Sequence, residues 1–391
     1  MPKYKPKAKL YCPSLWKSVH VDVDGYLTPC CLFIHGVDKK TRITDVDKIE
    51  TVLHDEFKPY REDLKAGVWP KGCNQCQFAE EEGRSSKRQQ DMHALEYGRN
   101  DEATMLSPPE EVNLEYLQLK TGRLCNLECT ICTPVCSTSI ATRLLKEGKI
   151  HRGYYNQLQE EIEWSYDIDE FRKMNSKLGY YRIDIAGGEP LMNKVHFKWL
   201  DELKNPEKTQ LLYNTNGTHV PTESEIEIWE KYRGIWLTFS IDSYRHKFEL
   251  LRVNAKWDEV LANMKYITED VIRKRFDQNT TNTAIVMTIH KGNIDDVFDL
   301  WDIVTNEINW IQEDPINFNY LYYPEHMAIH NMPKEALEKT INNFEKNMHR
   351  LPKGLKIRHE SENVLKSMKT FLGDKTVQHS RPIGHDHRDE A

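Results

Sequence analysis

Cysteine is the residue type in this sequence whose number and spacing point most directly to chemistry. The 391-residue chain has nine cysteines, at positions 12, 30, 31, 73, 76, 125, 129, 132 and 136, and none after that. An odd cysteine count in a long chain, with a charged start instead of a secretory signal, does not fit the disulfide framework of a small secreted protein. The thiols are therefore predicted to bind metal.

Three of these cysteines form a compact loop after a predicted strand. Cys125, Cys129 and Cys132 are separated by three and then two residues. Three thiolates on one tight loop can hold three irons of a cubic iron-sulfur cluster and leave the fourth iron open to another ligand. The alternative is a zinc site with Cys136 as fourth ligand, because zinc prefers four tetrahedral protein ligands. We favour the cluster, with Cys136 as a core residue.

Short apolar runs alternate with helix-length polar segments after residue 109. Six of these runs are read as strands, at residues 114–119, 181–185, 210–213, 235–241, 284–289 and 318–323. Strands joined through helices lie parallel and are buried on both faces, as in an open α/β sheet or a barrel. In either fold the functional site lies at the carboxyl ends of the strands.

Three polar motifs stand where predicted strands end. They are Gly187-Gly188-Glu189-Pro190 after the second strand, Asn214-Thr215-Asn216-Gly217 at the third, and Ser240-Ile241-Asp242-Ser243 at the fourth, with Arg252 twelve residues beyond Ser240. Zinc would not explain the glycine-rich motif. With the cysteine loop, the order of these motifs resembles the radical S-adenosylmethionine (SAM) superfamily, whose three cysteines follow the first strand of a partial (β/α)6 TIM-like barrel.

This resemblance covers about residues 112–325 and implies cofactors and roles. It implies a SAM-binding 4Fe-4S cluster on Cys125, Cys129 and Cys132. Gly187, Gly188 and Glu189 correspond to the segment that binds the amino group of SAM, and Ser240 and Arg252 to residues that contact its ribose and carboxylate. Ile131 stands where the superfamily usually has an aromatic residue, so adenine packing is expected to differ.

The implied activity is reductive cleavage of SAM to a 5'-deoxyadenosyl radical, which abstracts hydrogen from a substrate. The electron would come from an external donor such as flavodoxin or ferredoxin. The substrate is expected to be a peptide or a small biosynthetic intermediate, and no acid, base or hydrogen donor is assigned. The alternative function is an iron-sulfur electron-transfer or binding protein without SAM turnover.

The earlier cysteines predict a second metal site ahead of the barrel. Residues 19–27 alternate apolar and polar up to an Asp-Gly pair, which predicts a β-hairpin with Cys30 and Cys31 on its returning strand. The spacing Cys12-x12-Gly25-x4-Cys30, followed by Cys73-x2-Cys76, resembles the SPASM/twitch module of radical SAM enzymes. That resemblance implies an auxiliary 4Fe-4S cluster on Cys12, Cys30, Cys73 and Cys76. Cys31 would point to the opposite strand face, and structural zinc is again the alternative.

The chain is expected to have three parts. Residues 1–106 form the twitch-like module of hairpin and helix, residues 110–330 the barrel, and residues 331–391 a C-terminal helical segment and a polar tail; the paired prolines near 108 set the first boundary. The charged segment 79–99 is predicted to be a solvated helix, and residues 334–348 an amphipathic one. A metal-ligand role is not favoured for three residues of the polar tail, His379, His385 and His387, because chain ends are commonly unordered. Side chains near the strand ends could line a pocket, with packing favoured over catalysis for each of them: Tyr213, His290, Tyr320, Tyr322 and Tyr323.

Bulk composition excludes other classes of protein. The 54 Lys and Arg residues are outnumbered by 61 Asp and Glu residues and are dispersed along the chain, which disfavours nucleic-acid binding and with it a zinc-dependent nucleic-acid-binding protein. The longest apolar runs are too short to span a bilayer. The sequence therefore predicts a cytoplasmic protein without a membrane partner.

Overall fold

The computed structural model describes residues 11–33, 41–81, 86–96, 111–321 and 324–373. At its centre is an eight-stranded sheet with the order β10-β9-β7-β6-β5-β3-β1-β2. Its strands are β1 (Ser18–Val21), β2 (Leu27–Thr28), β3 (Tyr116–Lys120), β5 (Arg182–Ala186), β6 (Gln210–Thr215), β7 (Gly234–Ser240), β9 (Asn282–Ile289) and β10 (Ile316–Tyr320). Two short strands, β4 (Glu128–Cys129) and β8 (Arg252–Val253), pair with each other outside this sheet.

The six predicted strands are confirmed. They are β3, β5, β6, β7, β9 and β10, and each is parallel to its neighbours. They stand in the sheet in the order of the chain, which is the order of a β/α barrel, whereas a doubly wound sheet reverses its order at a switch point. Because β10 and β2 are the edges of the sheet, the barrel is partial.

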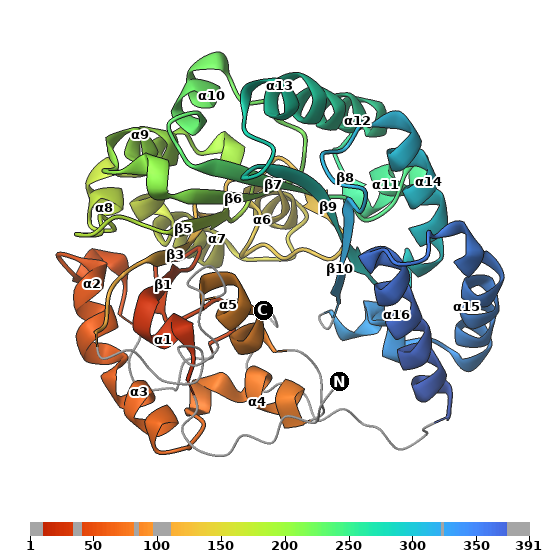
Figure 1. Cartoon of the computed structure of the whole chain (residues 1–391), viewed down its shortest axis with the longest axis horizontal. Helices are drawn as coiled ribbons and strands as arrows, with labels where there is room; N and C mark the ends of the chain where they lie inside the picture. Colours follow the sequence, from red (N-terminus) through yellow and green to blue (C-terminus); the bar gives the residue numbers. More distant parts are fainter. Residues whose placement is uncertain (1–10, 34–40, 82–85, 97–110, 322–323, 374–391) are drawn as a thin grey trace.

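Helices cover the outer face of the sheet, as Figure 1 shows for those between β5 and β10. On this face Leu117, Ile183, Leu211, Ile235 and Ile285 are completely buried, because side chains alternate along a strand and every second one packs under a helix. The helices of the barrel are α6 (Thr138–Lys146), α7 (Arg152–Glu160), α8 (Ile168–Arg172), α9 (Lys194–Glu202), α10 (Glu223–Trp229), α11 (Arg245–Leu251), α12 (Trp257–Lys265), α13 (Arg273–Arg275) and α14 (Val297–Glu307).

The inner face of the sheet carries polar and partly exposed side chains. Lys120, Asp184 and Thr238 are half-buried there, and Asn214 is exposed. Trp236, in the central strand β7, keeps 46% of its surface exposed. Among the described residues, the inside of the partial barrel is therefore an accessible polar surface on which the ring of Trp236 is exposed.

The N-terminal hairpin is part of the same sheet. As predicted, β1 and β2 pair antiparallel, and β1 also lies parallel to β3, with Val19 opposite Leu117. The prediction that Cys30 and Cys31 lie on the returning strand is wrong: β2 ends at Thr28, and both cysteines lie in the following turn, where Phe33 N donates to Cys30 O (3.1 Å). The short β2 ends there because Pro29 has no N–H for a further ladder bond.

The described N-terminal residues form the helices α1 (Pro13–Lys17), α2 (Ile49–Thr51), α3 (Lys58–Lys65), α4 (Asn74–Glu81) and α5 (Lys87–Glu96). Helix α1 packs against β1, and α3 and α5 pack against α1. The prediction of one solvated helix over residues 79–99 is wrong for its middle. Arg88 and Asp91 of α5 are 5% and 6% exposed. Their burial is tolerated because each charge has an ionic partner, Glu80 for Arg88 and Lys87 for Asp91.

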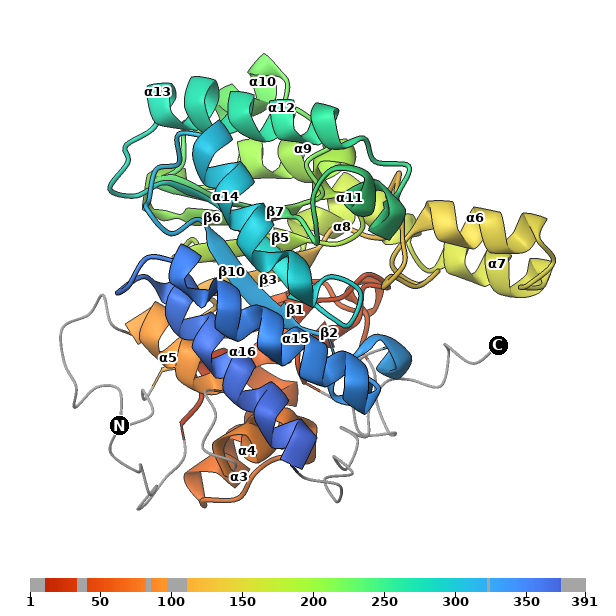
Figure 2. The same ribbon diagram turned by 90° about the vertical axis from the view of Figure 1, so that its right-hand side faces the viewer.

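Helices α6 and α7 project away from the barrel as an antiparallel pair, which Figure 2 shows from the side. They share a small apolar cluster that is separate from the main core and is built on Ala141, Ile150, Tyr154 and Leu158. The pair directly follows the cysteine loop in the chain.

Two α-helices follow β10 in the part of the chain that the structure describes. The predicted amphipathic segment 334–348 is α15 (Lys334–Asn347), whereas α16 (Lys356–Gly373) was not predicted. Ile357, Val364 and Met368 are buried on one side of α16, at a helical spacing that its many charged residues mask. Tyr322, Tyr323, His379, His385 and His387 lie outside the described residues. None of the described helices is long and apolar enough to cross a membrane.

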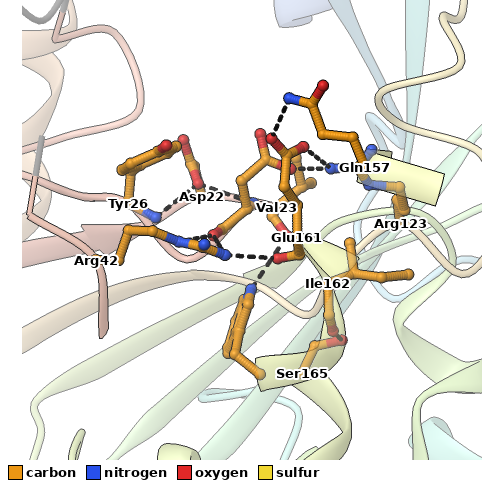
Figure 3. A network of polar contacts seen from close by, with 11 residues as sticks. Asp22, Val23, Tyr26, Arg42, Arg123, Gln157, Glu161, Ile162 and Ser165 are labelled. Carbon is orange, nitrogen blue, oxygen red and sulfur yellow. Dashed lines mark hydrogen bonds and ion pairs between the residues drawn. The ribbon is translucent and has the colours of Figure 1, made fainter. Parts of the chain in front are cut away.

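A polar network fixes the hairpin turn to the barrel (Figure 3). Arg42 donates to the carbonyl oxygens of Asp24 (2.7 Å) and Glu161 (2.9 Å). Arg123, which is completely buried, pairs with the carboxylates of Asp24 and Glu161. The turn, the start of the cysteine loop and the end of α7 therefore hold one another in place.

Arg42 is expected to contribute measurably to stability through this network. Arg42→Ala should lower the free energy of unfolding by about 2 kcal/mol, since hydrogen bonds from a charged donor contribute about 1.5–3 kcal/mol. The control is Arg172→Ala, which removes ion pairs to Asp169 and Glu202 from a 46% exposed side chain and should lower the free energy of unfolding much less, because water screens exposed ion pairs. Urea denaturation measures both, and equal losses would contradict the prediction.

Candidate iron-sulfur and SAM site

The cysteine loop follows β3 and is anchored at its centre by the small β4–β8 sheet. Cys129 lies opposite Arg252 in that sheet, and Thr130 N donates to Leu251 O (2.9 Å). Cys132 N donates to Cys129 O (3.0 Å), which closes the turn between these two thiols. Cys125, Cys129 and Cys132 are all half-buried, so the structure places the three predicted ligands on one loop at the carboxyl end of the barrel.

The glycine pair is explained by a close approach of two backbones. A Cβ at Gly188 would lie 2.4 Å from Leu124 O, and one at Gly187 would lie 2.8 Å from Gly122 O. Gly188 N and Glu189 N donate to Gly122 O (2.9 Å) and Leu124 O (2.7 Å). The end of β5 thereby continues the β3–β5 pairing into the cysteine loop, and only glycine fits in the space that remains.

The Glu189 carboxylate is buried and ties two strand ends together. It accepts from Leu191 N (3.1 Å), Thr215 Oγ1 (2.7 Å) and Asn216 N (2.6 Å). Burial raises its pKa to about 7, while these hydrogen bonds and Arg252 act in the opposite direction. A carboxylate has about four acceptor positions, so one remains for an incoming amino group.

Asn216 and Asn126 are part of the site, although sequence reasoning assigned them no role. Asn216 Nδ2 donates to Asn126 Oδ1 (3.0 Å) and toward Cys125 Sγ (3.9 Å). Asn126 also receives a hydrogen bond from Thr218 Oγ1 (3.3 Å). The signal that could have identified Asn216 was its place at the end of β6, level with the other motifs.

Arg252 lies between the cysteine loop and the end of β7. Its Nη2 pairs with Asp242 Oδ2 (2.6 Å), and its Nη1 donates toward Cys129 Sγ (3.9 Å). Its buried Nε has no hydrogen-bond partner among the described residues. Ser240 is half-buried at the same strand end, on the inner face. The site therefore holds a buried guanidinium with a free donor, which fits a carboxylate ligand.

Cys136 is the remaining cysteine of this region, and it lies next to the proposed cluster ligand Cys132. It is half-buried, and the prediction of a plain core residue does not describe its contacts. A hydrogen bond from the Cys132 thiol lowers the pKa of Cys136 to about 6. The described residues contain no group of three or more His, Cys, Asp or Glu side chains with the geometry for a single metal ion.

The four cysteines predicted for the auxiliary site line one small cavity, together with α5 residues. These are Cys12, Cys30, Cys73 and Cys76. The cavity closes around Gly72, where a Cβ would lie 2.3 Å from the ring of Phe33. Cys31 is exposed and is not among the residues that line the cavity.

The chemistry of both donor sets fits iron-sulfur clusters. Burial raises the pKa of Cys125 to about 11 and that of Cys12 to about 12. Without a cation such thiols stay protonated at neutral pH, and only metal binding displaces the protons. The number of thiols also fits, because three at the barrel end and four around the cavity correspond to a three-ligand and a four-ligand cluster.

The glycine pair provides a test of the geometry at the barrel end. Gly188→Ala should displace the cysteine loop and prevent its cluster from forming, so that iron content falls by about half if each site holds a four-iron cube. The control is Gly373→Ala, whose added methyl meets no atom within 4 Å. Iron analysis after anaerobic purification measures both, and a full iron complement in Gly188→Ala would contradict this account of the glycine.

Comparison with known proteins adds two family matches. Residues 119–300 match the model of the radical SAM superfamily, and residues 12–77 match that of the SPASM iron-sulfur cluster-binding domain. The GTP 3',8-cyclase of Alkaliphilus metalliredigens (strain QYMF) is 21% identical over 207 residues, which are 52% of this chain and 58% of that relative. The chain thus spans less than two thirds of the curated relative.

Two solved structures are also similar to this chain. Native anSMEcpe with bound AdoMet and a Cp18Cys peptide is 14% identical, with a TM-score of 0.34 and 60% of each chain covered. SuiB of Streptococcus suis bound to S-adenosylmethionine is 16% identical, with a TM-score of 0.34 over 60% of this chain and 44% of its own. The first family match contains the cysteine loop and the strand-end motifs, and the second contains the four cysteines of the cavity. On these grounds the chain contains a radical SAM domain over residues 119–300 and a SPASM iron-sulfur cluster-binding domain over residues 12–77.

Proposed function

We propose that this enzyme binds SAM at a cluster on Cys125, Cys129 and Cys132 and uses it to abstract hydrogen from a substrate inside the barrel. The bound cluster supplies the electron that cleaves SAM to methionine and a 5'-deoxyadenosyl radical. The observation that carries the proposal is the convergence of the strand ends of β5, β6 and β7 on the cysteine loop. Residues 188, 189 and 216 donate the hydrogen bonds that bring in β5 and β6. Arg252, which lies opposite Cys129, brings in the end of β7 through its ion pair with Asp242.

The strand-end residues are proposed to position SAM. Arg252 would receive the carboxylate of SAM on its unpaired Nε, and the remaining acceptor position of Glu189 would receive the amino group. Gly187 and Gly188 would present their backbone to the same ligand, and Ser240 would contact the ribose from the inner face. The roles of Arg252 and Glu189 use a donor and an acceptor position that the protein itself leaves open, as described above.

The substrate is proposed to bind on the polar inner face, between the two cysteine sites. Cys31 N donates to Gln118 Oε1 (3.3 Å), and Gln118 stands on the inner face of β3. The turn that carries Cys30 therefore borders the inside of the barrel. We infer a peptide or a small biosynthetic intermediate as substrate, and flavodoxin or ferredoxin in the cytoplasm as the electron donor.

Removal of the loop cysteines tests the site of SAM cleavage. Cys125→Ala, Cys129→Ala and Cys132→Ala should each abolish the formation of 5'-deoxyadenosine under dithionite, because each removes one of only three protein ligands. Cys73→Ala with Cys76→Ala is the control and should retain basal cleavage. Chromatography of anaerobic reactions measures the product. Iron-containing wild-type protein that cleaves no SAM would instead favour the electron-transfer alternative.

Arg252 should contribute to SAM binding and not to iron content. Changing Arg252 alone would leave Asp242 buried without its partner, so the variant is Arg252→Gln combined with Asp242→Asn. The dissociation constant for SAM should rise roughly tenfold to a hundredfold, because a charged hydrogen bond contributes about 1.5–3 kcal/mol. Asp242→Asn alone is the control. Calorimetry with wild-type iron content measures the constant, and an unchanged value would contradict the assignment.

A further inference from the structure

Helix α5 forms part of the auxiliary cavity although it lies beyond the residues that match the SPASM domain. That match ends at residue 77, and α5 begins at Lys87. Lys87, Arg88 and Asp91 line the same cavity as the four cysteines. The first turn of α5 thus faces the thiols, and its charged side chains border the space that a cluster would occupy.

Arg88 fastens α5 over the cavity. Its guanidinium donates to Glu80 of α4 (2.8 and 2.7 Å) and to Tyr11 O (2.7 Å). It also lies over the ring of Trp69 at 5.6 Å. All three contacts join α5 to segments that carry or flank the cysteines, so the position of α5 is fixed relative to them.

Lys87 and Asp91 form a second ion pair in the lining of the cavity. Lys87 Nζ lies 2.8 Å from Asp91 Oδ1, and Asp91 Oδ2 accepts from Ser14 Oγ (2.7 Å). Both side chains are nearly buried, with 15% and 8% of their surface exposed. Lys87 and Asp91 thus place opposite charges in the wall of the cavity that the four thiols line.

The charge near a buried cluster decides how readily the cluster accepts an electron. A 4Fe-4S cluster with four thiolate ligands is an anion, and reduction adds one more negative charge. In a poorly solvated cavity a neighbouring cation stabilises the reduced state and a neighbouring carboxylate opposes it. The pair Lys87–Asp91 supplies both charges at one place.

We propose that α5 closes the auxiliary cluster site and that the buried pair Lys87–Asp91 sets the reduction potential of this cluster. The proposal rests on the proposed function, since it requires a cluster on Cys12, Cys30, Cys73 and Cys76. Lys87 and Asp91 act as positioning and charge-setting residues and are not ligands. Removal of either charge should therefore change the potential without removing a ligand, and the two changes should have opposite directions.

The experiment is a redox titration followed by electron paramagnetic resonance on the full-length chain. Cys125→Ala, Cys129→Ala and Cys132→Ala together form the background, so that the auxiliary cluster alone gives the signal. Lys87→Met should lower the equilibrium constant for reduction about tenfold, which is 59 mV for a one-electron couple, and Asp91→Asn should raise it about as much. The double variant should return close to the background. Lys65→Met, which removes an exposed lysine from α3 of the same module, is the matched control.

The outcomes separate this proposal from the function on which it rests. Opposite shifts that cancel in the double variant support it, because a purely structural role would not give them. Equal potentials, or shifts in one direction, overturn it while leaving the cluster in place. If Lys87→Met loses its iron, Lys87→Arg should keep both iron and potential, and Asp91→Asn must still raise the potential. A background protein without a cluster, or with zinc, would overturn the auxiliary site itself.

Discussion

The close approach of two strand ends is the constraint on which the site depends. Where β3 and β5 end, the backbone of residues 187–188 lies against that of residues 121–124, and a single Cβ would meet atoms at 2.4 to 2.9 Å. This contact makes the cysteine loop an extension of the sheet. Cys125 therefore begins from a rigid position, and the loop does not have to be ordered by its metal alone.

The other contacts of the loop build on that one. Glu189 follows the glycine pair and reaches β6 through Thr215 and Asn216, and Asn216 reaches back to the loop through Asn126. Arg252 fixes the far end of the loop through the β4–β8 pair. The strand ends thus contact the loop of the three thiols from several sides. A substitution that moves one strand end is therefore expected to move the metal ligands as well.

The sequence predicted the parts of this arrangement that are local and missed those that are not. The six strands, the hairpin and the spacing of the cysteines follow from patterns within a few residues. The pairing of Cys129 with Arg252, and of Arg123 with Asp24, joins residues about a hundred positions apart, for which a single sequence holds no direct signal. The prediction placed Cys30 on the returning strand, whereas it lies in the turn after it. The alternating pattern predicts that a strand is present but does not show that it ends at Thr28.

The burial of α5 shows why its charge pattern led to the wrong prediction of a solvated helix. A run rich in Lys, Arg, Glu and Gln is normally a solvated helix face, but here Arg88 and Asp91 are buried against a small part of the chain. Apolar residues of that part, such as Leu15 and Trp16, pack in the main core, whereas α5 borders a cavity lined by four thiols. Ion pairs and a bound cluster would fill this side of α5, so we expect the packing of α5 to be coupled to metal binding. The charged residues of α5 are then buried because they line the metal site. Apolar residues in their place would leave the negative charge of a bound cluster without a neighbouring positive charge.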